Sequence, residues 1–302
     1  MTHKPVMLNE VLESLAIRDG KVFVDCTFGA GGYSSAILSK ADCNVIAIDR
    51  DPTTQKYADK IKAEFGEKFQ YLNGNFGEIQ KVLKEYGLVD GVVYDLGVSS
   101  MQLDQKERGF SFQSNAKLDM RMSISGKSAY EVVNEDSEEE LADILYYYGE
   151  EHAARRIAKK IVEARIESPI ETTFQLANII RSVVGNRGKI DGATKSFQAI
   201  RIAVNDELKA IEYSLQQLPD ILKIGGRAVV VSFHSLEDKI VKKFFHENSE
   251  VKIAKSKYSK ANEEQDKNFR LISKKSIKPE RAEIVANPRA RSARLRVIEK
   301  VR

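Results

Sequence analysis

The chain has 302 residues and a formal net charge of +4, and its 42% hydrophobic and 30% charged residues are typical of a globular protein with one core and one inserted or appended domain. No window reaches the apolar length of a membrane-spanning helix, and no apolar segment follows the N-terminal residues as in a secretory signal. The two cysteines, Cys26 and Cys43, offer neither a disulfide framework nor metal-ligand spacing, so we expect a cytoplasmic protein without a structural metal.

Four apolar runs rich in β-branched residues occur early in the chain, with helical stretches such as Tyr33–Lys40 and Thr53–Phe65 between them. Near-continuous apolar strands that alternate with helices are typical of a parallel sheet covered on both faces. We therefore predict a doubly wound α/β core. Its first four strands are Lys21–Thr27, Asn44–Asp49, Phe69–Asn73 and Val89–Asp95.

A helical pattern replaces this alternation from about Glu107 to Ala199. Ser137, followed by three glutamates and an apolar stripe, is a capping box at the start of a helix. Apolar residues from Phe197 to Leu218 recur at steps of three and four, which predicts one long amphipathic helix. That helix could pack internally or at a dimer interface, so both a monomer and a homodimer are compatible with it.

The strand pattern returns after Gly226. Arg227–Phe233 is predicted to be a buried strand, His234–His246 a helix, and Leu295–Lys300 the last strand. The prediction is therefore an α/β core, formed by residues 1–104 and 203–302, that is interrupted by an inserted helical domain at 105–202.

The C-terminal part of the chain is basic. Residues 251–302 contain 16 Lys and Arg against 6 Asp and Glu, a net charge of +10, which leaves −6 for residues 1–250. This asymmetry favours contact with a polyanion and a solvated charged surface about equally. Residues 252–282 are polar and Lys-rich with little periodicity, and we interpret them as a mobile loop or hairpin.

A glycine-rich turn, with Gly29, Gly31 and Gly32, follows the first strand and opens the first core helix. Such a turn lets a ligand approach backbone N–H groups at a helix N-terminus. Dinucleotide enzymes use the pattern G-x-G-x-x-G, but Ser34 stands where the third glycine would be.

Further polar or aromatic residues follow the next three strands. Asp49 ends the second strand, where a carboxylate can accept hydrogen bonds from both hydroxyls of a ribose. Phe76 follows the third strand and could pack on an adenine, although a core role is nearly as compatible with the pattern. Asp95 ends the fourth strand, at the edge where open α/β sheets bind ligands.

The order of glycine turn, acid, polar-aromatic loop and acid resembles the class I S-adenosylmethionine-dependent methyltransferases. Longer strings, which together cover essentially the whole chain, resemble the bacterial 16S rRNA cytosine-N4 methyltransferase family, also called MraW. They are His3–Leu8, Asp95–Ser100, Gln102–Asp104, Arg108–Phe112, Leu118–Met122, Phe197–Ile202, Val204–Leu208, Ser232–Asp238 and Asn287–Ser292.

The resemblance implies methylation of N4 of a cytosine in the decoding region of 16S rRNA, with 16S rRNA, naked or within the small ribosomal subunit, as the partner. It implies S-adenosyl-L-methionine as the cofactor, and no metal. The family's glycine turn usually ends Gly-Gly-His, whereas this one ends Gly31-Gly32-Tyr33. A backbone contact of Tyr33 is compatible with this change, but a role that depends on the imidazole is not. The cofactor-binding residues implied by motif position are Gly31, Gly32, Tyr33, Asp49, Phe76, Asp95 and Gln102.

Cytosine N4 is a poor nucleophile because its lone pair is delocalised into the ring, so acceptors around the amine and a path for its proton are needed. The Pro-Pro-aromatic segment of DNA amino-methyltransferases is absent after the fourth strand. The catalytic residues are unknown, with Asp95, Ser99 and His234 as candidates; His234 is at least as compatible with a structural role. Neither cysteine is placed for a covalent C5 mechanism.

A target base must leave its stack to reach the sheet edge, and the insertion after the fourth strand adjoins that edge. The insertion is therefore predicted to recognise substrate. The lining residues that we predict are Arg108, Phe110, Phe112 and Arg121, with packing as an equal alternative for the phenylalanines. Near the C-terminus, phosphate contact is predicted for Arg289, Arg291, Arg294 and Arg296.

Three other functions compete with this interpretation. A nicotinamide-dependent oxidoreductase would share the glycine turn, but Ser34 and the long strings argue against it. A methyltransferase of another RNA, or a non-catalytic RNA-binding protein on the same scaffold, would share most of the strings. Retention of Asp49, Asp95 and Gln102 argues against the non-catalytic protein.

Overall fold

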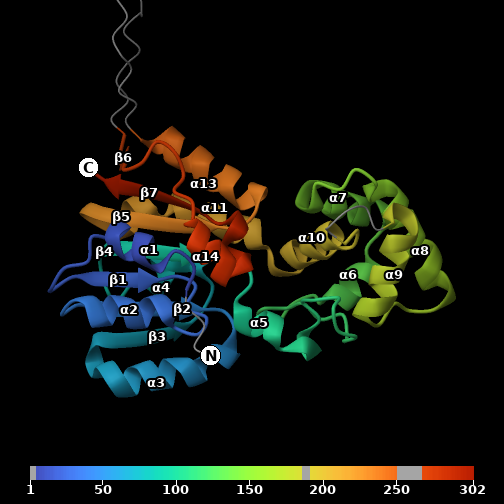
Figure 1. Ribbon diagram of the computed structural model, residues 1–302, viewed down its shortest axis with the longest axis horizontal. Coiled ribbons are helices and arrows are strands. Elements are labelled where there is room, and N and C mark those ends of the chain that lie inside the picture. The colour runs from blue at the N-terminus through green and yellow to red at the C-terminus, as the bar shows by residue number, and fades with distance from the viewer. Residues whose placement is uncertain (1–4, 186–190, 250–266) are drawn as a thin grey trace, which may run out of the picture. The chain divides into compact units, whose positions relative to one another are not determined.

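The computed structural model describes residues 5–185, 191–249 and 267–302, so His3 and Lys4 of the opening string lie outside the described residues. Two compact units make up the chain (Figure 1). One, which we call the sheet unit, is Met1–Gly97 with Leu208–Arg302, and the other, the helical unit, is Val98–Glu207. Residues 98–104 and 203–207, which we had placed in the core, belong to the helical unit.

Packing explains this difference in the boundaries. The side chains of Val98 and Leu103 contact the hydrophobic cluster of the helical unit, as does Val204. The amide of Asn205 is hydrogen-bonded within the same unit, to Met120 and Met122. The unit boundaries therefore lie after the strand end at Gly97 and after Glu207.

The sheet unit is built on a seven-stranded sheet with the order β3-β2-β1-β4-β5-β7-β6. The first five strands are parallel, and β7 runs antiparallel between β5 and β6. The predicted doubly wound sheet is confirmed. The strands are β1 (Val22–Asp25), β2 (Asn44–Asp49), β3 (Phe69–Asn73), β4 (Val89–Asp95), β5 (Leu222–Ser232), β6 (Phe269–Leu271) and β7 (Arg294–Lys300).

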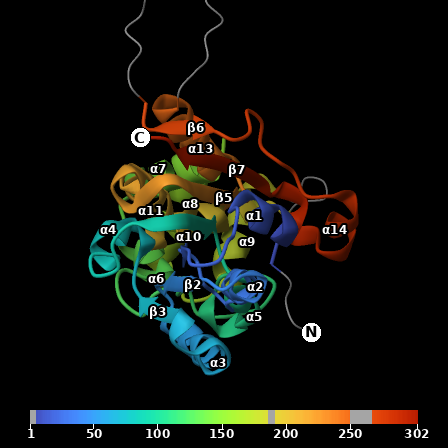
Figure 2. The same cartoon turned by 90° about the vertical axis from the view of Figure 1, so that its left-hand side faces the viewer.

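Alternate residues of each strand enter opposite hydrophobic clusters, as the period of two requires. Phe23 packs into one cluster and Val24 into the other. Helices cover both faces, with α1 and α2 on one side of the strands and α4 and α11 on the other (Figure 2). The helices are α1 (Leu8–Ser14), α2 (Gly32–Lys40), α3 (Gln55–Phe65), α4 (Ile79–Val82), α11 (Glu207–Gln216), α12 (Leu218–Ile221), α13 (Ser235–Asn248) and α14 (Arg281–Ala286).

Short 3₁₀ helices connect several of these elements, namely Pro52–Thr54, Gly66–Lys68, Phe76–Glu78 and Pro288–Ser292 in the sheet unit and Lys106–Arg108 in the helical unit. The predicted loop or hairpin at 252–282 is only partly described, because residues 250–266 lie outside the described ranges. Its remainder contains β6, which pairs with β7, and the start of α14. The low periodicity of this polar segment did not reveal either element.

The helical unit has its own hydrophobic cluster. Capping boxes begin four of its helices, and the caps are Ser99, Ser128, Ser137 and Thr172. Each cap satisfies N–H groups that a helix N-terminus leaves without partners. The helices are α5 (Ser100–Asp104), α6 (Ala129–Glu135), α7 (Glu138–Gly149), α8 (Ala154–Glu167), α9 (Thr173–Val184) and α10 (Thr194–Asn205).

The long helix predicted from Phe197 to Leu218 is wrong. Asp206 adopts a left-handed conformation, with φ 47° and ψ 36°, and separates α10 from α11. The guanidinium of Arg201 makes two bonds to the carboxylate of Glu207, of 2.8 and 2.9 Å, across this break. The apolar repeat continues through Asp206, so periodicity alone did not show the break.

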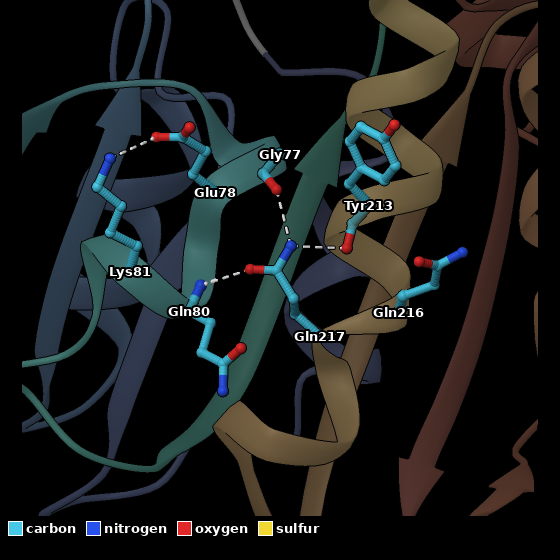
Figure 3. A pocket seen from close by; sticks show the side chains of 7 residues that line it. All are labelled: Gly77, Glu78, Gln80, Lys81, Tyr213, Gln216 and Gln217. Carbon is cyan, nitrogen blue, oxygen red and sulfur yellow. Dashed lines mark hydrogen bonds and ion pairs between the residues drawn. The ribbon is translucent and has the colours of Figure 1, made fainter.

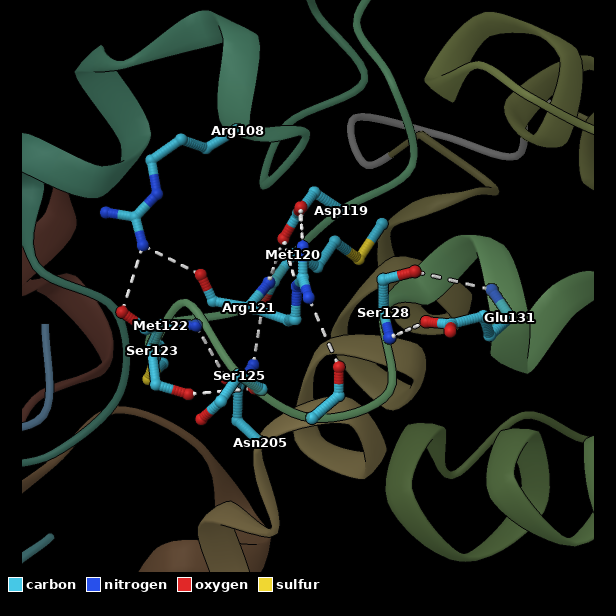
Figure 4. A network of polar contacts seen from close by, with 11 residues as sticks. Arg108, Asp119, Met120, Arg121, Met122, Ser123, Ser125, Ser128, Glu131 and Asn205 are labelled. Carbon is cyan, nitrogen blue, oxygen red and sulfur yellow. Dashed lines mark hydrogen bonds and ion pairs between the residues drawn. The ribbon is translucent and has the colours of Figure 1, made fainter.

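Asn205 holds the end of α10 to the loop before α6 (Figure 4). Its side chain is buried, donates to the carbonyls of Met120 and Arg201 at 2.8 and 2.9 Å, and accepts the N–H of Met122 at 2.7 Å. Met120 has a φ of +58°, which a non-glycine residue adopts only when its surroundings hold it there.

We expect Asn205→Ala to lower the free energy of unfolding by about 1–3 kcal/mol, because it leaves buried backbone groups without partners. Asn134 is a matched control: its amide also makes three backbone bonds, but it is only half-buried, so water can replace them. Urea unfolding followed by circular dichroism should show a larger loss for Asn205→Ala than for Asn134→Ala. Equal losses would contradict the importance of burial at Asn205.

Candidate functional site

The glycine turn joins β1 to α2 and presents a helix N-terminus. Gly31 has a φ of +80°, and a Cβ there would lie 2.3 Å from Ile61 Cδ1 and 2.7 Å from Phe28 Cε2, so a side chain is excluded. Gly31 is also the N-cap of α2, and no side chain caps this helix. The N–H groups of its first turn are therefore not occupied by a capping side chain and can meet an anionic ligand.

Asp49 at the end of β2 is brought to this turn. Its carboxylate accepts the N–H of Gly29 at 2.7 Å and the N–H of Asp51 at 2.8 Å. Burial raises the pKa of Asp49 to about 6, although these two backbone bonds act in the opposite direction. Each oxygen has accepted one bond, and a carboxylate oxygen can accept a second.

A buried layer beneath the turn was missed by the sequence analysis. Asp25, at the end of β1, is fully buried and accepts the hydroxyl of Ser34 at 2.8 Å. Burial raises its pKa to about 6 against the effect of that bond. The hydroxyl of Thr27 accepts the N–H of Asp95 at 2.6 Å and thereby joins β1 to the end of β4. An acid at the end of an otherwise apolar strand was the available signal.

Asp95 differs from the other two carboxylates. Its Oδ1 is buried and has no hydrogen-bond partner among the described residues. Burial, followed by the charges of Asp25 and Glu237, raises the pKa of Asp95 to about 8. A buried polar atom without a partner is costly, so this oxygen marks a place where a ligand can supply the missing donor.

Tyr33 is turned into the protein. Its side chain is only 3% exposed, and its hydroxyl donates to the carbonyl of Val6. The neighbouring Gly32 lies under the N-terminal segment, because a Cβ there would be 2.3 Å from Pro5 Cγ. Any contact of Tyr33 with a ligand at the turn is therefore left to its backbone.

Phe76 lies in the loop after β3, and its ring packs edge-on against Tyr94 with centroids 5.7 Å apart. The amide of Gln217 in the sheet unit holds this loop: it donates to Gly77 O at 2.7 Å and accepts from Gln80 N at 2.9 Å (Figure 3). A surface cavity of about 360 Å³ is lined by the residues that make these hydrogen bonds. We therefore assign these residues a structural role.

Ser99 and Gln102 belong to the helical unit. They form the capping box of α5, in which Ser99 Oγ accepts the Gln102 N–H at 3.3 Å and Gln102 Oε1 accepts the Ser99 N–H at 3.0 Å. The Ser99 hydroxyl keeps its own proton for donation. This cap gives both residues a local structural function.

His234 caps α13 in the same way. Its Nδ1 accepts the N–H of Glu237 at 3.5 Å, and the carboxylate of Glu237 accepts the backbone N–H groups of Phe233 and His234 at 2.7 and 3.2 Å. Nε2 of His234 lies 2.9 Å from Glu237 Oε1, although not in hydrogen-bond geometry. The cap thus occupies Nδ1 of His234, whereas its buried Nε2 has no hydrogen-bond partner among the described residues.

The residues predicted to line a base pocket make contacts within the helical unit, and Figure 4 shows those of Arg108 and Arg121. Arg108 donates to the carbonyls of Arg121 and Met122 and stacks on Phe110, which is buried. Arg121 makes two bonds to Asp119. Phe112 packs on Phe197 with ring centroids 4.9 Å apart. The two phenylalanines thus pack within the helical unit, whereas the packing alternative to a base pocket had placed them between insertion and core.

The basic C-terminal strand is also partly committed to structure. Arg296 is bonded twice to the buried carboxylate of Asp238 at 2.7 and 3.1 Å, and Arg294 once at 3.0 Å. Burial acts to raise the pKa of Asp238, but the bonds and charges of these arginines outweigh it and lower the pKa. The Arg296 side chain is 12% exposed and that of Arg294 is 50% exposed, so of these two arginines Arg294 is the one available for phosphate contact.

Within residues 5–185, 191–249 and 267–302, no helix is long and apolar enough to cross a membrane. The same residues contain no group of three or more His, Cys, Asp or Glu side chains that could hold a metal ion.

The raised pKa of Asp95 predicts a pH dependence of stability. An acid with a higher pKa in the folded than in the unfolded chain binds more protons when folded, so stability falls as pH rises between the two values. The loss of stability due to Asp25 and Asp49 is largely complete near pH 6, where these two groups titrate in the folded chain. The loss due to Asp95 continues to about pH 8. We expect Asp95→Asn to reduce the fall between pH 6 and 8 by up to about 1.4 kcal/mol per pH unit.

Chemical unfolding of the wild type and of Asp95→Asn between pH 6 and 8 measures this difference in the free energy of unfolding. Asp49→Asn is the matched control and should instead flatten the dependence between about pH 4 and pH 6. Parallel curves for the wild type and Asp95→Asn above pH 6 would show that Asp95 does not titrate there.

Similarity to known proteins extends over the whole chain. A family model described as the MraW methylase family matches residues 1–301. The chain is 52% identical over 306 aligned positions to "Ribosomal RNA small subunit methyltransferase H" of Orientia tsutsugamushi, covering 99% of this chain and 98% of the relative. It is 54% identical to the protein of the same name from Rickettsia felis, covering 99% of each.

Among solved structures, an rRNA methylase from Streptococcus thermophilus is similar, with a TM-score of 0.45 and 9% identity, covering 100% of this chain and 99% of that one. The family match and the two relatives confirm the expected methyltransferase, and with it the class I α/β fold that carries the glycine turn and the strand-end acids. The chain belongs to the MraW methylase family.

Proposed function

We propose that this protein transfers a methyl group from S-adenosyl-L-methionine to N4 of a cytosine in the decoding region of 16S rRNA, in the cytoplasm. The names of its relatives support rRNA of the small ribosomal subunit as the substrate class. The observation that carries the catalytic part is the buried Oδ1 of Asp95, which has no partner in the described part of the chain and ends the strand next to β1, where an α2 N-terminus without a side-chain cap follows.

The sheet unit fits this cofactor. The first-turn N–H groups of α2, at Gly32 and Tyr33 after Gly31, suit the carboxylate of its methionine part. Asp49 would accept the ribose hydroxyls while its carboxylate holds the N–H of Gly29 in the turn. Phe76 would lie against the adenine. We propose a contact for Gln102 as well, on the basis of its motif position after the fourth strand.

When bound, the cofactor supplies the methyl group on a positively charged sulfur. The work of the protein is to align the cytosine amine with it, and alignment can supply about 7–11 kcal/mol of a barrier. Asp95 Oδ1 would accept an N–H of the amine and hold the nitrogen in place. The amine loses a proton in the reaction, which can pass to a nearby carboxylate or to water.

The three catalytic candidates are not equivalent. Asp95 has a buried oxygen without a partner among the described residues, whereas Ser99 Oγ and His234 Nδ1 are engaged in helix caps. We therefore propose Asp95 as the residue that orients the amine, with Ser99 next, because its hydroxyl oxygen accepts one bond in the cap and can accept a second. His234 is proposed as a positioning residue for the start of α13.

The helical unit, Val98–Glu207, is proposed to recognise the substrate. The side chains of Arg108, Arg121, Phe110 and Phe112 shape this unit from within. Their effect on a base pocket would therefore be indirect, through the loop backbone that they fix. We keep them as candidates on that basis.

The first experiment is methyl incorporation from labelled S-adenosyl-L-methionine into 30S subunits that lack the native cytosine-N4 methylation. We expect the label in N4-methylcytidine of 16S rRNA after nuclease digestion and nucleoside mass spectrometry. Parallel reactions with naked 16S rRNA show whether the assembled subunit is needed. Label in another nucleoside or another RNA would establish a different acceptor, and cofactor binding without any label would favour the non-catalytic protein.

A second experiment concerns Tyr33. We expect Tyr33→Phe to bind the cofactor with nearly wild-type affinity, because its hydroxyl is bonded to Val6 and faces the protein interior. Loss of that bond should lower the free energy of unfolding by about 1 kcal/mol. Isothermal titration calorimetry and thermal unfolding measure the two effects. An affinity loss of about tenfold or more, which is about 1.4 kcal/mol, without a change in stability would indicate a side-chain contact.

A further inference from the structure

A second surface cavity of about 220 Å³ lies in the sheet unit, where β5 passes into α13. One wall is formed by Phe233, His234 and Ser235, and the other by Lys278 and residues 291–294. Ligand pockets for whole small molecules are usually larger, roughly 300–1,000 Å³. The cavity is therefore suited to one compact chemical group.

The lining of this cavity is cationic. It includes Lys278, Arg291 and Arg294, together with the hydroxyls of Ser235 and Ser292, and no acidic side chain among the described residues. Lys278 and Arg291 are exposed and make no hydrogen bond or ion pair with a described side chain. Three neighbouring cations repel one another unless an anion joins them.

Two carboxylates that follow the lining residue Ser235 in the sequence are already engaged by bonds of their own. Asp238 is held by Arg296 and Arg294 in a cluster of two positive charges and one negative charge. Glu237 is fully buried and accepts N–H groups of Phe233 and His234. The bond to Asp238 also fixes the direction of the Arg294 guanidinium, which prepares it for a second partner.

The cavity lies at the edge of the sheet that carries the candidate methyl-transfer site. Val231 of β5 pairs with Asp95 of β4, and the cavity begins two residues later, at Phe233. An anion bound there would thus be held near the strand end at which we place the cytosine amine.

We propose that this cavity, lined by Lys278, Arg291 and Arg294, binds one phosphodiester group of the substrate RNA and so fixes the RNA strand relative to Asp95. The inference rests on the proposed function, because RNA is the source of the phosphate. A phosphate matches the size of the cavity and offers acceptors to both arginines and to the hydroxyls. Arg296, which the sequence had placed among the phosphate contacts, acts only by holding Asp238.

The test compares the wild type with Lys278→Ala/Arg291→Ala. Binding of the cofactor-free full chain to unmethylated 30S subunits is measured between 50 and 200 mM KCl, roughly the range over which phosphate contacts dominate. We expect the slope of log K against log salt to fall in magnitude by about 0.7, the value for one phosphate of a single strand. At the lowest salt, affinity should drop about tenfold, which corresponds to about 1.4 kcal/mol.

Lys40→Ala/Lys84→Ala is the matched control. It removes the same charge from exposed lysines at the end of α2 and in the connection before β4, at the opposite edge of the sheet. We expect this control to keep the wild-type slope, and both double variants to keep wild-type affinity for S-adenosyl-L-methionine and wild-type melting temperature.

Three outcomes would overturn the proposal. If Lys278→Ala/Arg291→Ala kept the wild-type slope while the wild type methylated 30S subunits, the cavity would have no part in RNA binding although the proposed function stood. If inorganic phosphate bound to the cavity in calorimetry but the RNA slope did not change, the site would serve a free anion. If the wild type bound neither 30S subunits nor 16S rRNA, the proposed function and this assignment would fail together.

Discussion

Burial of carboxyl groups at the ends of neighbouring strands is the constraint on which the candidate site depends. Asp49, Asp25 and Asp95 end β2, β1 and β4, which lie side by side in the sheet. Burying such groups is costly unless hydrogen bonds compensate. The Gly29 N–H and the Ser34 hydroxyl compensate the first two. The turn between β1 and α2 is consequently fixed by the acids that surround it.

The end of the helical unit is set by a different feature, the helix break at Asp206. A continuous helix would carry the apolar repeat from Phe197 straight on to Leu218. Instead, the chain leaves α10 at Asn205, whose amide is already bonded to the loop at Met120, and starts α11 after one left-handed residue. An ion pair between Arg201 and Glu207 joins the two sides of this break. Side-chain bonds to distant loops, which no local pattern contains, thus determine where the helix ends.

Strand patterns and the glycine turn could be predicted because their causes are local. Six of the strands follow from apolar runs, and the acids at the ends of two of them, Asp49 and Asp95, follow from their positions. The partners of polar side chains could not be predicted, since they are set by tertiary contacts. Arg296 was expected to contact phosphate and is bound to Asp238, 58 residues earlier.

The role of a single residue was hardest to predict where one side chain can serve two purposes. Tyr33 stands at a motif position of the cofactor turn, and yet its ring enters the core and its hydroxyl reaches Val6. His234 and Gln102 likewise match motif positions and cap helices. Such residues couple the site to the fold, because changing them alters the backbone on which the site is built.

The contrast between Asp95 and the other buried acids supports the role that we propose for Asp95. The carboxylates of Asp49, Asp25 and Asp238 are bonded to backbone, hydroxyl and arginine groups, and each bond offsets part of the cost of burial. Asp95 has similar surroundings and two carboxylates close enough to raise its pKa, but its Oδ1 has no partner among the described residues. Local rules of polar satisfaction are broken mainly at functional sites. A cationic cofactor and an amine that donates hydrogen bonds would each lower this cost, so the energy stored at Asp95 favours binding of the reactants that we propose.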